Sequence, residues 1–380
     1  MVDMRADFTV LSELPLTADR QARALLSYIC EPSSGIARSV RADNAEQVLT
    51  AVRSGEHGES AAATAQHRWQ GVDIASVLGE LAQRGGGFLT PSDPGWPSQL
   101  NDLQEVPLGL WVRGSHPLRL LAAQSVSIVG ARASTNYGQR QALTMSAQLA
   151  ERGFSVVSGG AYGIDAAAHR GALTAGMTVC VLASGIDTPY PSSHASLFDE
   201  IATAGVLVSE VPPHEPARRF RFLSRNRIIA ALSRGTVVIE ASLRSGSLGT
   251  ARRARDIGRT VMAMPGPVTS DASSGCHELL RHDPDTVLVT CAADVLEVVG
   301  ALGVDAVGWR SGPVNPLDSV GDDARRVHDY LTGPMTPAQV SVVCGLPHST
   351  VMTALVELAA HRLAQRQDAR WMRVAPAQIS

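Results

Sequence analysis

The stretch 125–165 constrains the fold more than any other part of the chain. A short apolar, β-branched run (126–129) is followed by a helical run (139–152) and by a second apolar run (154–157) that stops at Ser158 and two glycines. Two such runs joined by a helix predict a parallel βαβ unit. Both predicted strands end in small residues that open a helix, so backbone N–H groups and a positive dipole end can face an anion. The stretch therefore predicts a phosphate-holding site.

Further short apolar runs follow at regular intervals, separated by helical stretches or long loops. They span 178–182, 206–209, 236–239, 260–263 and 286–289. Short apolar strands that alternate with helices predict an α/β fold, with a Rossmann-like, doubly wound, mainly parallel sheet. In such folds the ligand lies outside the carboxyl ends of the strands.

The rest of the chain predicts smaller accessory parts. Residues 1–84 have helical periodicity at 18–29, 44–53 and 72–84, with Thr17 and Asp43 as N-caps, and predict a small helical, SAM-like domain. A segment rich in proline and aromatic residues then leads into the sheet domain, which we expect to cover 85–300. It is typical of a connection packed across the sheet edge, with Trp96 and Trp111 as packing residues.

The C-terminal part predicts a linker over 301–323 and a winged-helix domain over 324–380. The linker is rich in Gly, Pro and Asp, and three helical stretches (324–331, 336–344 and 349–361) precede a hairpin-like tail with its turn near Asp368. Such modules bind nucleic acid or protein. The candidate recognition helix carries almost no basic side chains, which disfavours sequence-specific duplex binding.

Composition limits the chemistry. All 33 basic residues are arginine, so Schiff-base and P-loop lysines are excluded, and anions must be held by arginine, backbone amides or hydroxyls. The net charge of −3 argues against a uniformly basic coat. No apolar run approaches the roughly 18 residues of a membrane span, and the start predicts no signal peptide. The five scattered cysteines indicate neither a disulfide framework nor a zinc cluster, so we expect a cytoplasmic protein.

Four strand-end segments carry candidate phosphate contacts: 130–134, 158–165, 218–227 and 240–250. Arg132 follows a strand end directly, where its fork can clamp a phosphate, although a salt-bridged surface arginine would fit too. Arginine mixed with phenylalanine at 218–227 is typical of a single-strand groove, or of a solvated charged face. The candidates are Gly130, Arg132, Ser134, Ser158, Gly159, Gly160, Gly163, Arg225, Asn226, Arg227, Ser245, Gly246, Ser247 and Thr250.

Two further expectations concern local structure in these segments. Residues 225–227 run directly into an apolar stretch, which predicts that they stand at a helix start. His169 lies one helical turn beyond Asp165, which predicts a structural hydrogen bond between the two side chains. Neither residue has a nucleophile at a matching place, so we expect no catalytic residue, no metal and no cofactor.

Two enzyme classes can be weighed against the motifs. A nicotinamide-binding unit requires an acid at the end of its second strand, but the runs after both glycine loops end in serine, which disfavours NAD. Nucleotide-hydrolysing "lonely guy" proteins have a P-G-G-x-G-T-x-x-E signature, and here Arg253 stands at the position of the glutamate. A nucleotide-binding or nucleotide-hydrolysing enzyme of that type stays the alternative to a binding protein, and a protein-binding scaffold is a third class.

Several motifs in order resemble the DprA/Smf family, the DNA-processing protein A of natural transformation. They cover about 87–299 and read VGARASTNYG, SGGAYGIDAAAHRGAL, YPSSH, SEVPP, SRNRIIAAL, EASLRSGSLGTARRA and PGPVTSDASSGCHELLRH. The resemblance implies a protein that binds single-stranded DNA without cutting it and forms a homodimer. It also implies that the protein protects incoming strands and helps to load RecA recombinase onto DNA covered by single-strand-binding protein.

The resemblance also implies roles for individual residues. Arg132 should contact backbone phosphate, and the glycines of the second loop should line the same pocket, together with residues 225–227 and 245–247. The sequence departs from the family at three places: Tyr162 stands where arginine is frequent, Leu223 replaces proline, and the Tyr-Pro segment lacks lysine. We expect Tyr162 to compensate by stacking on a base.

Overall fold

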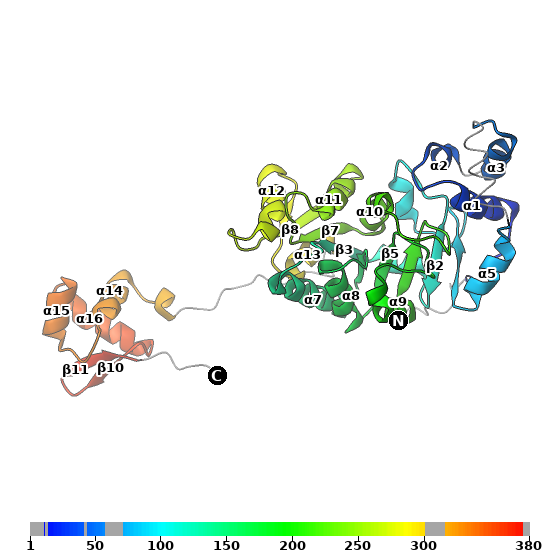
Figure 1. Ribbon diagram of the computed structural model, residues 1–380. Helices are drawn as coiled ribbons and strands as arrows, with labels where there is room; N and C mark the ends of the chain where they lie inside the picture. The colour runs from blue at the N-terminus through cyan, green and yellow to red at the C-terminus, as the bar shows by residue number, and fades with distance from the viewer. Residues whose placement is uncertain (1–10, 12–13, 42–43, 58–70, 301–315, 375–380) are drawn as a thin grey trace. The chain divides into compact units, whose positions relative to one another are not determined.

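The computed structural model of this protein describes residue 11 and residues 14–41, 44–57, 71–300 and 316–374. Its internal contacts divide the chain into two compact units, Met1–Val307 and Gly308–Ser380 (Figure 1). The sequence-based boundary at residue 84 stays a prediction. So does the linker at 301–323, of which residues 301–315 lie outside the described part.

A nine-stranded sheet forms the centre of the first unit, in the order β1-β2-β6-β5-β4-β3-β7-β8-β9 (Figure 1). The strands from β6 to β9 in this order run parallel, whereas β2 is antiparallel to both of its neighbours. The predicted doubly wound, mainly parallel sheet is confirmed. The strands are β1 Gly86–Leu89, β2 Leu110–Gly114, β3 Ser125–Gly130, β4 Ser155–Ser158, β5 Thr178–Leu182, β6 Val206–Ser209, β7 Gly235–Ile239, β8 Thr260–Met264 and β9 Val287–Leu288.

Strands β1 and β2 correct the expectation for the segment before β3. It does lie at the edge of the sheet, but it supplies two strands there, with Leu89 paired to Leu110 and Trp111 paired to Ser209. The many prolines and glycines of this segment hid the two short strands from prediction. The strands form because β2 can pair with the free edge of β6, and β1 can then pair with β2. Trp96 and Trp111 are both buried, which confirms that they are packing residues.

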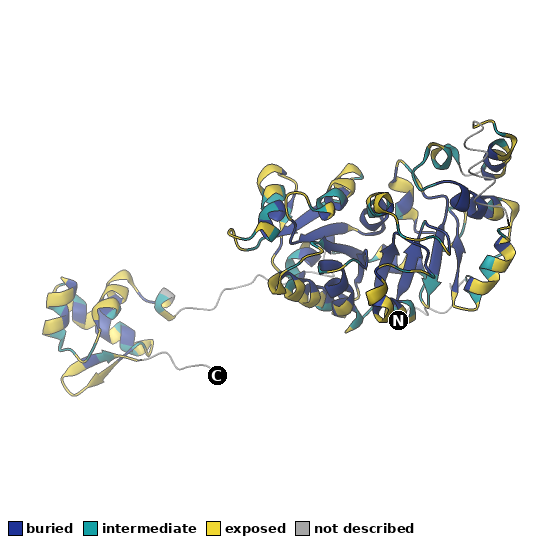
Figure 2. Cartoon of the chain, viewed as in Figure 1, coloured by how far each residue is buried: buried dark blue, intermediate teal, exposed yellow. Residues whose placement is uncertain are grey.

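Helices cover both faces of the sheet, because alternate residues of each central strand point to opposite sides. Val129 belongs to the core beneath one helical layer, and Ile128 belongs to the core on the other face. Figure 2 shows the strands buried between these layers. The first layer contains α6 Leu118–Ala123, α10 Arg219–Leu232, α11 Gly246–Asp256 and α12 Ser274–His282, and the second contains α7 Asn136–Glu151, α8 Ile164–Leu173, α9 Ala195–Ala204 and α13 Ala292–Val299.

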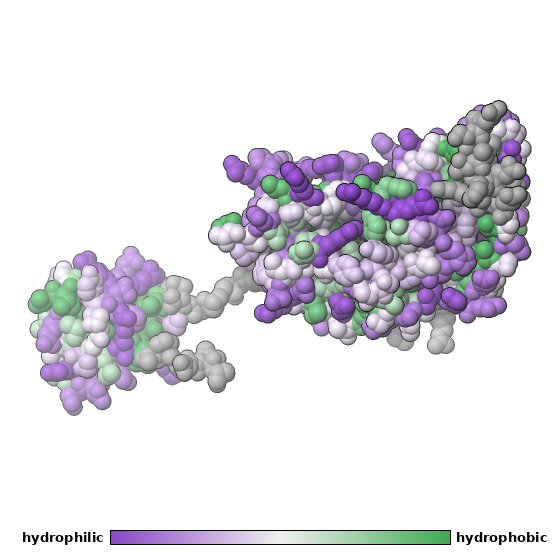
Figure 3. Space-filling view, in the orientation of Figure 1, coloured by the Kyte–Doolittle hydropathy of each residue, from purple (hydrophilic) through white to green (hydrophobic). Residues whose placement is uncertain are grey.

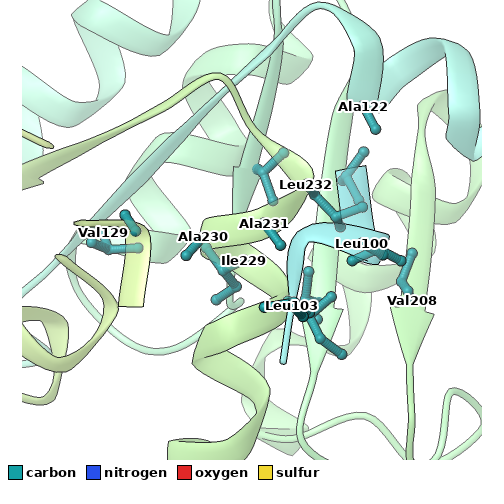
Figure 4. Packing of buried hydrophobic residues seen from close by; sticks show 14 of the residues in the cluster. Leu100, Leu103, Ala122, Val129, Val208, Ile229, Ala230, Ala231 and Leu232 are labelled. Atoms are coloured by element: carbon teal, nitrogen blue, oxygen red, sulfur yellow. The ribbon is translucent and has the colours of Figure 1, made fainter. Parts of the chain in front are cut away.

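The second half of α10 is the most apolar part of the first layer. Residues 229–232 are fully buried and pack among Leu100, Leu103, Val129 and Val208 (Figure 4). Burial of this half anchors the helix, so its polar first half is held in a defined orientation above the strand ends.

The N-terminal helices share a core with the sheet. Leu26 of α1 and Val52 of α3 belong to the same buried cluster as Phe88 and Trp111 of the edge strands. Thr17 is the N-cap of α1, as predicted, and its side chain accepts a hydrogen bond from the Arg20 amide. The other predicted cap, residue 43, lies outside the described residues. The helices are α1 Ala18–Ile29, α2 Gly35–Ser39, α3 Ala45–Ser54 and α5 Ile74–Ala82.

The second unit has its own apolar core. Three helices and a two-stranded hairpin surround it, at the places predicted from the sequence: α14 Asp322–Tyr330, α15 Pro337–Cys344, α16 His348–Ala360, β10 Ala364–Gln367 and β11 Arg370–Arg373. Its assignment as a winged helix stays a prediction. Within the described ranges no single helix is long and apolar enough to cross a membrane, although α15 and α16, bent by 108°, pass such a criterion together by length and composition.

Candidate nucleic-acid interface

A cavity of about 530 Å³ opens at the point where the chain reverses its direction across the sheet. From β3 the strands are added on one side as β4, β5 and β6, and from β7 they are added on the other side as β8 and β9 (Figure 1). Strands β3 and β7 are parallel neighbours, so the loops that follow them diverge and leave a crevice. Ligands of doubly wound folds bind at this switch point.

All four segments predicted from the sequence contribute to this first cavity. Residues from the loops after β3, β4 and β7 and from the first half of α10 line it together. The predicted contacts among the lining residues are Gly130, Arg132, Arg225, Asn226, Ser245, Gly246, Ser247 and Thr250. The predicted contacts outside the lining are Ser134, Ser158, Gly159, Gly160, Gly163 and Arg227.

Arg132 is the most available cation of this site. Its side chain is exposed, and its guanidinium carbon lies 4.8 Å from the centre of the Phe222 ring. Tyr190 in turn packs edge-on against Phe222 at 5.9 Å. No carboxylate forms an ion pair with Arg132 in the part of the chain that the structure describes. Its charge is therefore open to a phosphate, with an aromatic ring beside it. Hydrophilic residues, with some apolar ones between them, lie on the surface over α10 and α11 (Figure 3).

The loop that carries Arg132 is held by Glu240. This residue directly follows β7, has a φ of 51° and is buried. Its carboxylate accepts a hydrogen bond from the Thr135 amide at 2.8 Å and another from the Thr135 hydroxyl, and its carbonyl accepts one from the Ala131 amide at 2.7 Å. A positive φ at a non-glycine residue is costly and persists where surrounding structure requires it. Here it lets Glu240 hold both ends of the Arg132 loop.

Two predicted glycines support the cavity from behind. A Cβ on Gly163, whose φ is 79°, would lie only 2.3 Å from the Ala131 carbonyl oxygen. A Cβ on Gly159 would lie 2.1 Å from Nη1 of Arg225. These positions are therefore glycine because other parts of the site approach them closely.

The other predicted residues of the second loop are also structural. The Ser158 hydroxyl donates to the Ile128 carbonyl at 2.6 Å, inside the sheet. Gly160 has a φ of 67° and packs against Phe198. The Ser134 hydroxyl is buried without a hydrogen-bond partner among the described residues. None of these side chains reaches the cavity surface.

Arg225 and Asp165 form a buried charged layer at the base of the cavity. Nη1 of Arg225 donates to the Gly159 carbonyl at 2.8 Å and to the Val181 carbonyl. Burial raises the pKa of Asp165, an effect that the nearby Arg225 opposes, and burial lowers the pKa of Arg225. Because the Arg225 guanidinium is hydrogen-bonded to these carbonyl oxygens, it is not free to clamp a phosphate. Arg225 instead contributes positive potential and part of the shape of the cavity floor.

The predicted helix start at residues 225–227 is wrong. Helix α10 begins at Arg219, so these residues lie near its middle, where successive side chains point about 100° apart. Asn226 faces α11, and its Nδ2 donates to the Gly246 carbonyl at 3.3 Å. Arg227 points elsewhere: its Nη2 forms an ion pair with Glu210 at 2.7 Å. Residues 219–224 contain no proline or glycine that would prevent the helix from beginning before residue 225.

The start of α11 presents its backbone to the cavity. Ser245 is the N-cap, and its Oγ accepts a hydrogen bond from the Ser247 amide at 3.4 Å. A Cβ on Gly246 would meet no atom within 4 Å, so the space in front of this helix end is open. An open helix N-terminus favours an anion. The later arginines of α11, Arg252, Arg253 and Arg255, are exposed and lie outside the cavity lining.

The predicted Asp165–His169 hydrogen bond is wrong. Nδ1 of His169 lies 2.7 Å from the Thr178 hydroxyl of β5, whereas Asp165 accepts a hydrogen bond from the Ala161 amide at 3.4 Å. Burial lowers the pKa of His169 to about 3, which keeps the ring neutral. One helical turn places the two residues on one side of α8, but His169 finds its partner in β5 and Asp165 in the loop before α8.

Some lining residues were not predicted. Phe222, Ser242 and Asp271 face the cavity. The alternation of arginine and phenylalanine was a sequence signal for Phe222. Ser242 and Asp271 are isolated polar residues in loops, and the sequence around them gives no such signal. Tyr162 is exposed, but it lies outside this lining: its hydroxyl is 2.8 Å from the Ser193 hydroxyl, and its ring packs edge-on against His194.

The fold and the cavity together define a doubly wound α/β protein with a cavity at the switch point of its sheet, lined by arginines, serines and glycines. A family model described as DNA recombination-mediator protein A matches residues 87–300, and the chain belongs to this family. It is 42% identical over 366 residues to a DNA processing protein DprA of Mycobacterium tuberculosis, with 92% of this chain and 93% of that protein covered.

Solved structures of family members are similar as well. DNA processing protein A from Streptococcus pneumoniae is 31% identical, with a TM-score of 0.57, and the match covers 76% of this chain and 94% of the other. A second structure concerns the single-stranded DNA binding mode of DNA processing protein A from Helicobacter pylori. It is 28% identical, with a TM-score of 0.50, and the match covers 56% of this chain and 94% of the other.

Proposed function

We propose that this protein binds single-stranded DNA in the first cavity and acts as a recombination mediator without cutting the strand. The observation that carries the proposal is Arg132, an exposed cation without a carboxylate partner among the described residues, stacked on Phe222 at the rim of a cavity that also receives the open N-terminus of α11. Guanidinium and backbone amides suit phosphates, and exposed rings suit unstacked bases.

Family membership supports a more specific role. The Helicobacter pylori relative is described by its binding of single-stranded DNA, and we extend that property to this chain. We further propose that the protein forms a homodimer in the cytoplasm, protects incoming strands and assists the loading of RecA onto DNA covered by single-strand-binding protein. Strand exchange by RecA on such DNA, with and without this protein, tests the loading step separately from DNA binding.

A nucleotide-hydrolysing enzyme is the weaker interpretation. It would require an acid on α11, where Arg253 is exposed on the outside of the helix. Asp165 is buried beneath the cavity next to Arg225, which favours a structural role for its carboxylate. Release of base or phosphate from nucleoside monophosphates by the purified protein would favour the enzyme over the mediator.

Fluorescence anisotropy of a labelled oligo-dT across a range of salt concentrations tests the proposed function. The logarithm of the affinity should fall with the logarithm of the salt concentration by roughly 0.7 per phosphate contact. Arg132→Ala should weaken binding and reduce that slope by about one contact. Arg140→Ala, which removes an exposed arginine of α7 outside the cavity, is the matched control and should bind as the wild type does. Absence of binding at low salt, or equal loss in both variants, would refute the proposal.

A further inference from the structure

A second cavity, of about 350 Å³, lies between the N-terminal helices and the sheet. Residues of α1 and α2, the segment 104–109, Glu210 after β6 and Arg227 of α10 line it. Helix α10 thus contributes Arg225 and Asn226 to the first cavity and Arg227 to the second. A space of this size is at the lower end of the range for small-molecule sites.

The floor of the second cavity contains a charged pair with unused hydrogen-bonding capacity. Nη2 of Arg227 lies 2.7 Å from Oε1 of Glu210, and its Nε donates to the Ser33 hydroxyl at 3.2 Å. Nη1 of Arg227 and Oε2 of Glu210 are buried and have no hydrogen-bond partner in the described part of the chain. The Arg227 side chain is 3% exposed and the Glu210 side chain 9% exposed. A buried donor and a buried acceptor without partners are costly, so the pair points to a ligand that supplies both.

The walls of this cavity are apolar, and its mouth is rich in arginine. Pro32, Pro107 and Leu108 contribute apolar surfaces suited to a flat ring. Arg38 and Arg41 are exposed. The lining carries four arginines (Arg23, Arg38, Arg41 and Arg227) and two glutamates (Glu105 and Glu210), so its formal charge is 4 − 2 = +2. An apolar slot with a positive rim suits a planar group that bears an anion.

We propose that the second cavity binds a mononucleotide, with the edge of its base at Glu210 and Arg227 and its phosphate at Arg38 and Arg41. Each nucleobase carries a donor beside an acceptor on its pairing edge, which matches one free carboxylate oxygen and one free guanidinium nitrogen. The ligand is either a free nucleotide or the terminal nucleotide of a DNA strand. The inference rests on the second cavity alone and does not depend on binding at the first.

Isothermal titration calorimetry on the full chain tests this site, with AMP, GMP, CMP and dTMP as separate ligands and inorganic phosphate as a further probe. We expect one nucleotide per chain, with phosphate alone bound more weakly. Glu210→Gln, which keeps the shape of the side chain, should lower the affinity roughly tenfold, because it removes a charged acceptor. The double variant Arg38→Ala and Arg41→Ala changes only exposed side chains and should lower it by a similar factor.

Two controls separate this site from the first cavity. Arg84→Ala removes an exposed arginine outside the lining and should leave nucleotide binding unchanged. Arg132→Ala should weaken oligo-dT binding and leave mononucleotide binding intact. A 5′-phosphorylated oligonucleotide that displaces the mononucleotide from the Arg132→Ala variant would identify a strand end as the natural ligand, and failure to displace it would identify a free nucleotide. No nucleotide binding at millimolar concentration would overturn the proposal, as would binding lost in Arg132→Ala and kept in both second-cavity variants.

Discussion

Gly163→Ala should weaken the binding of single-stranded DNA, although Gly163 lies outside the lining of the first cavity. Gly163 is the N-cap of α8, with φ 79° and ψ −122°, a conformation that is open to glycine and strained for other residues. The added Cβ would lie 2.3 Å from the Ala131 carbonyl oxygen and 2.6 Å from that of Arg132. The substitution therefore acts on the backbone of the loop that presents Arg132.

The magnitude follows from two contributions. The strained backbone costs about 1–3 kcal/mol of folding stability. Ordinary contact begins at 3.4 Å, so the Arg132 loop must retreat by about 3.4 − 2.3 = 1.1 Å. A displacement of that size disrupts a charge-assisted hydrogen bond to phosphate, which contributes about 1.5–3 kcal/mol, or roughly tenfold or more in affinity.

Gly258→Ala is the matched control. Gly258 follows α11 with φ 70°, but a Cβ there would meet no atom within 4 Å. It should lose about 1–2 kcal/mol of stability and none of its DNA affinity. Urea denaturation gives the stability of both variants, and anisotropy with oligo-dT gives their affinities. If folded Gly163→Ala bound oligo-dT as tightly as Gly258→Ala does, the contact between the two loops would have no bearing on binding.

Three further outcomes are expected. Arg225→Met should lower the free energy of unfolding by about 3–5 kcal/mol, because it leaves buried acceptors unpaired, and a loss below 1 kcal/mol in urea denaturation would contradict this role. Asn226→Ala should cost about 1 kcal/mol through the hydrogen bond to Gly246, and an unchanged midpoint would show that this bond is dispensable. His169 has a pKa lowered to about 3 against 6.5 when unfolded, so its contribution is present above pH 6.5 and is lost as the pH falls toward 3. His169→Gln should therefore make the unfolding free energy less dependent on pH below about 6, by up to 1.4 kcal/mol per pH unit, and an unchanged slope would refute a neutral buried ring.

Local patterns were sufficient to locate most elements. The runs at 178–182 and 206–209 are strands with the predicted bounds, and the helix at 18–29 has both predicted ends. These features depend on neighbours in sequence: β-branched apolar runs favour strands, and apolar residues at three- and four-residue steps favour helices. The strands at 86–89 and 110–114 were not predicted, because they form only against an edge that the rest of the sheet provides.

The sequence by itself determined that this chain is a doubly wound α/β protein with arginine-rich and glycine-rich strand ends, and its ordered motifs identified the family. Only the tertiary structure decided what each candidate residue does. It leaves Arg132 open beside Phe222, buries Arg225 against backbone carbonyls, and turns Arg227 toward Glu210 in a separate cavity. The reason is geometric: neighbouring helical residues point about 100° apart, and strand order brings together loops that are distant in sequence, so the partners of each side chain are set by long-range packing.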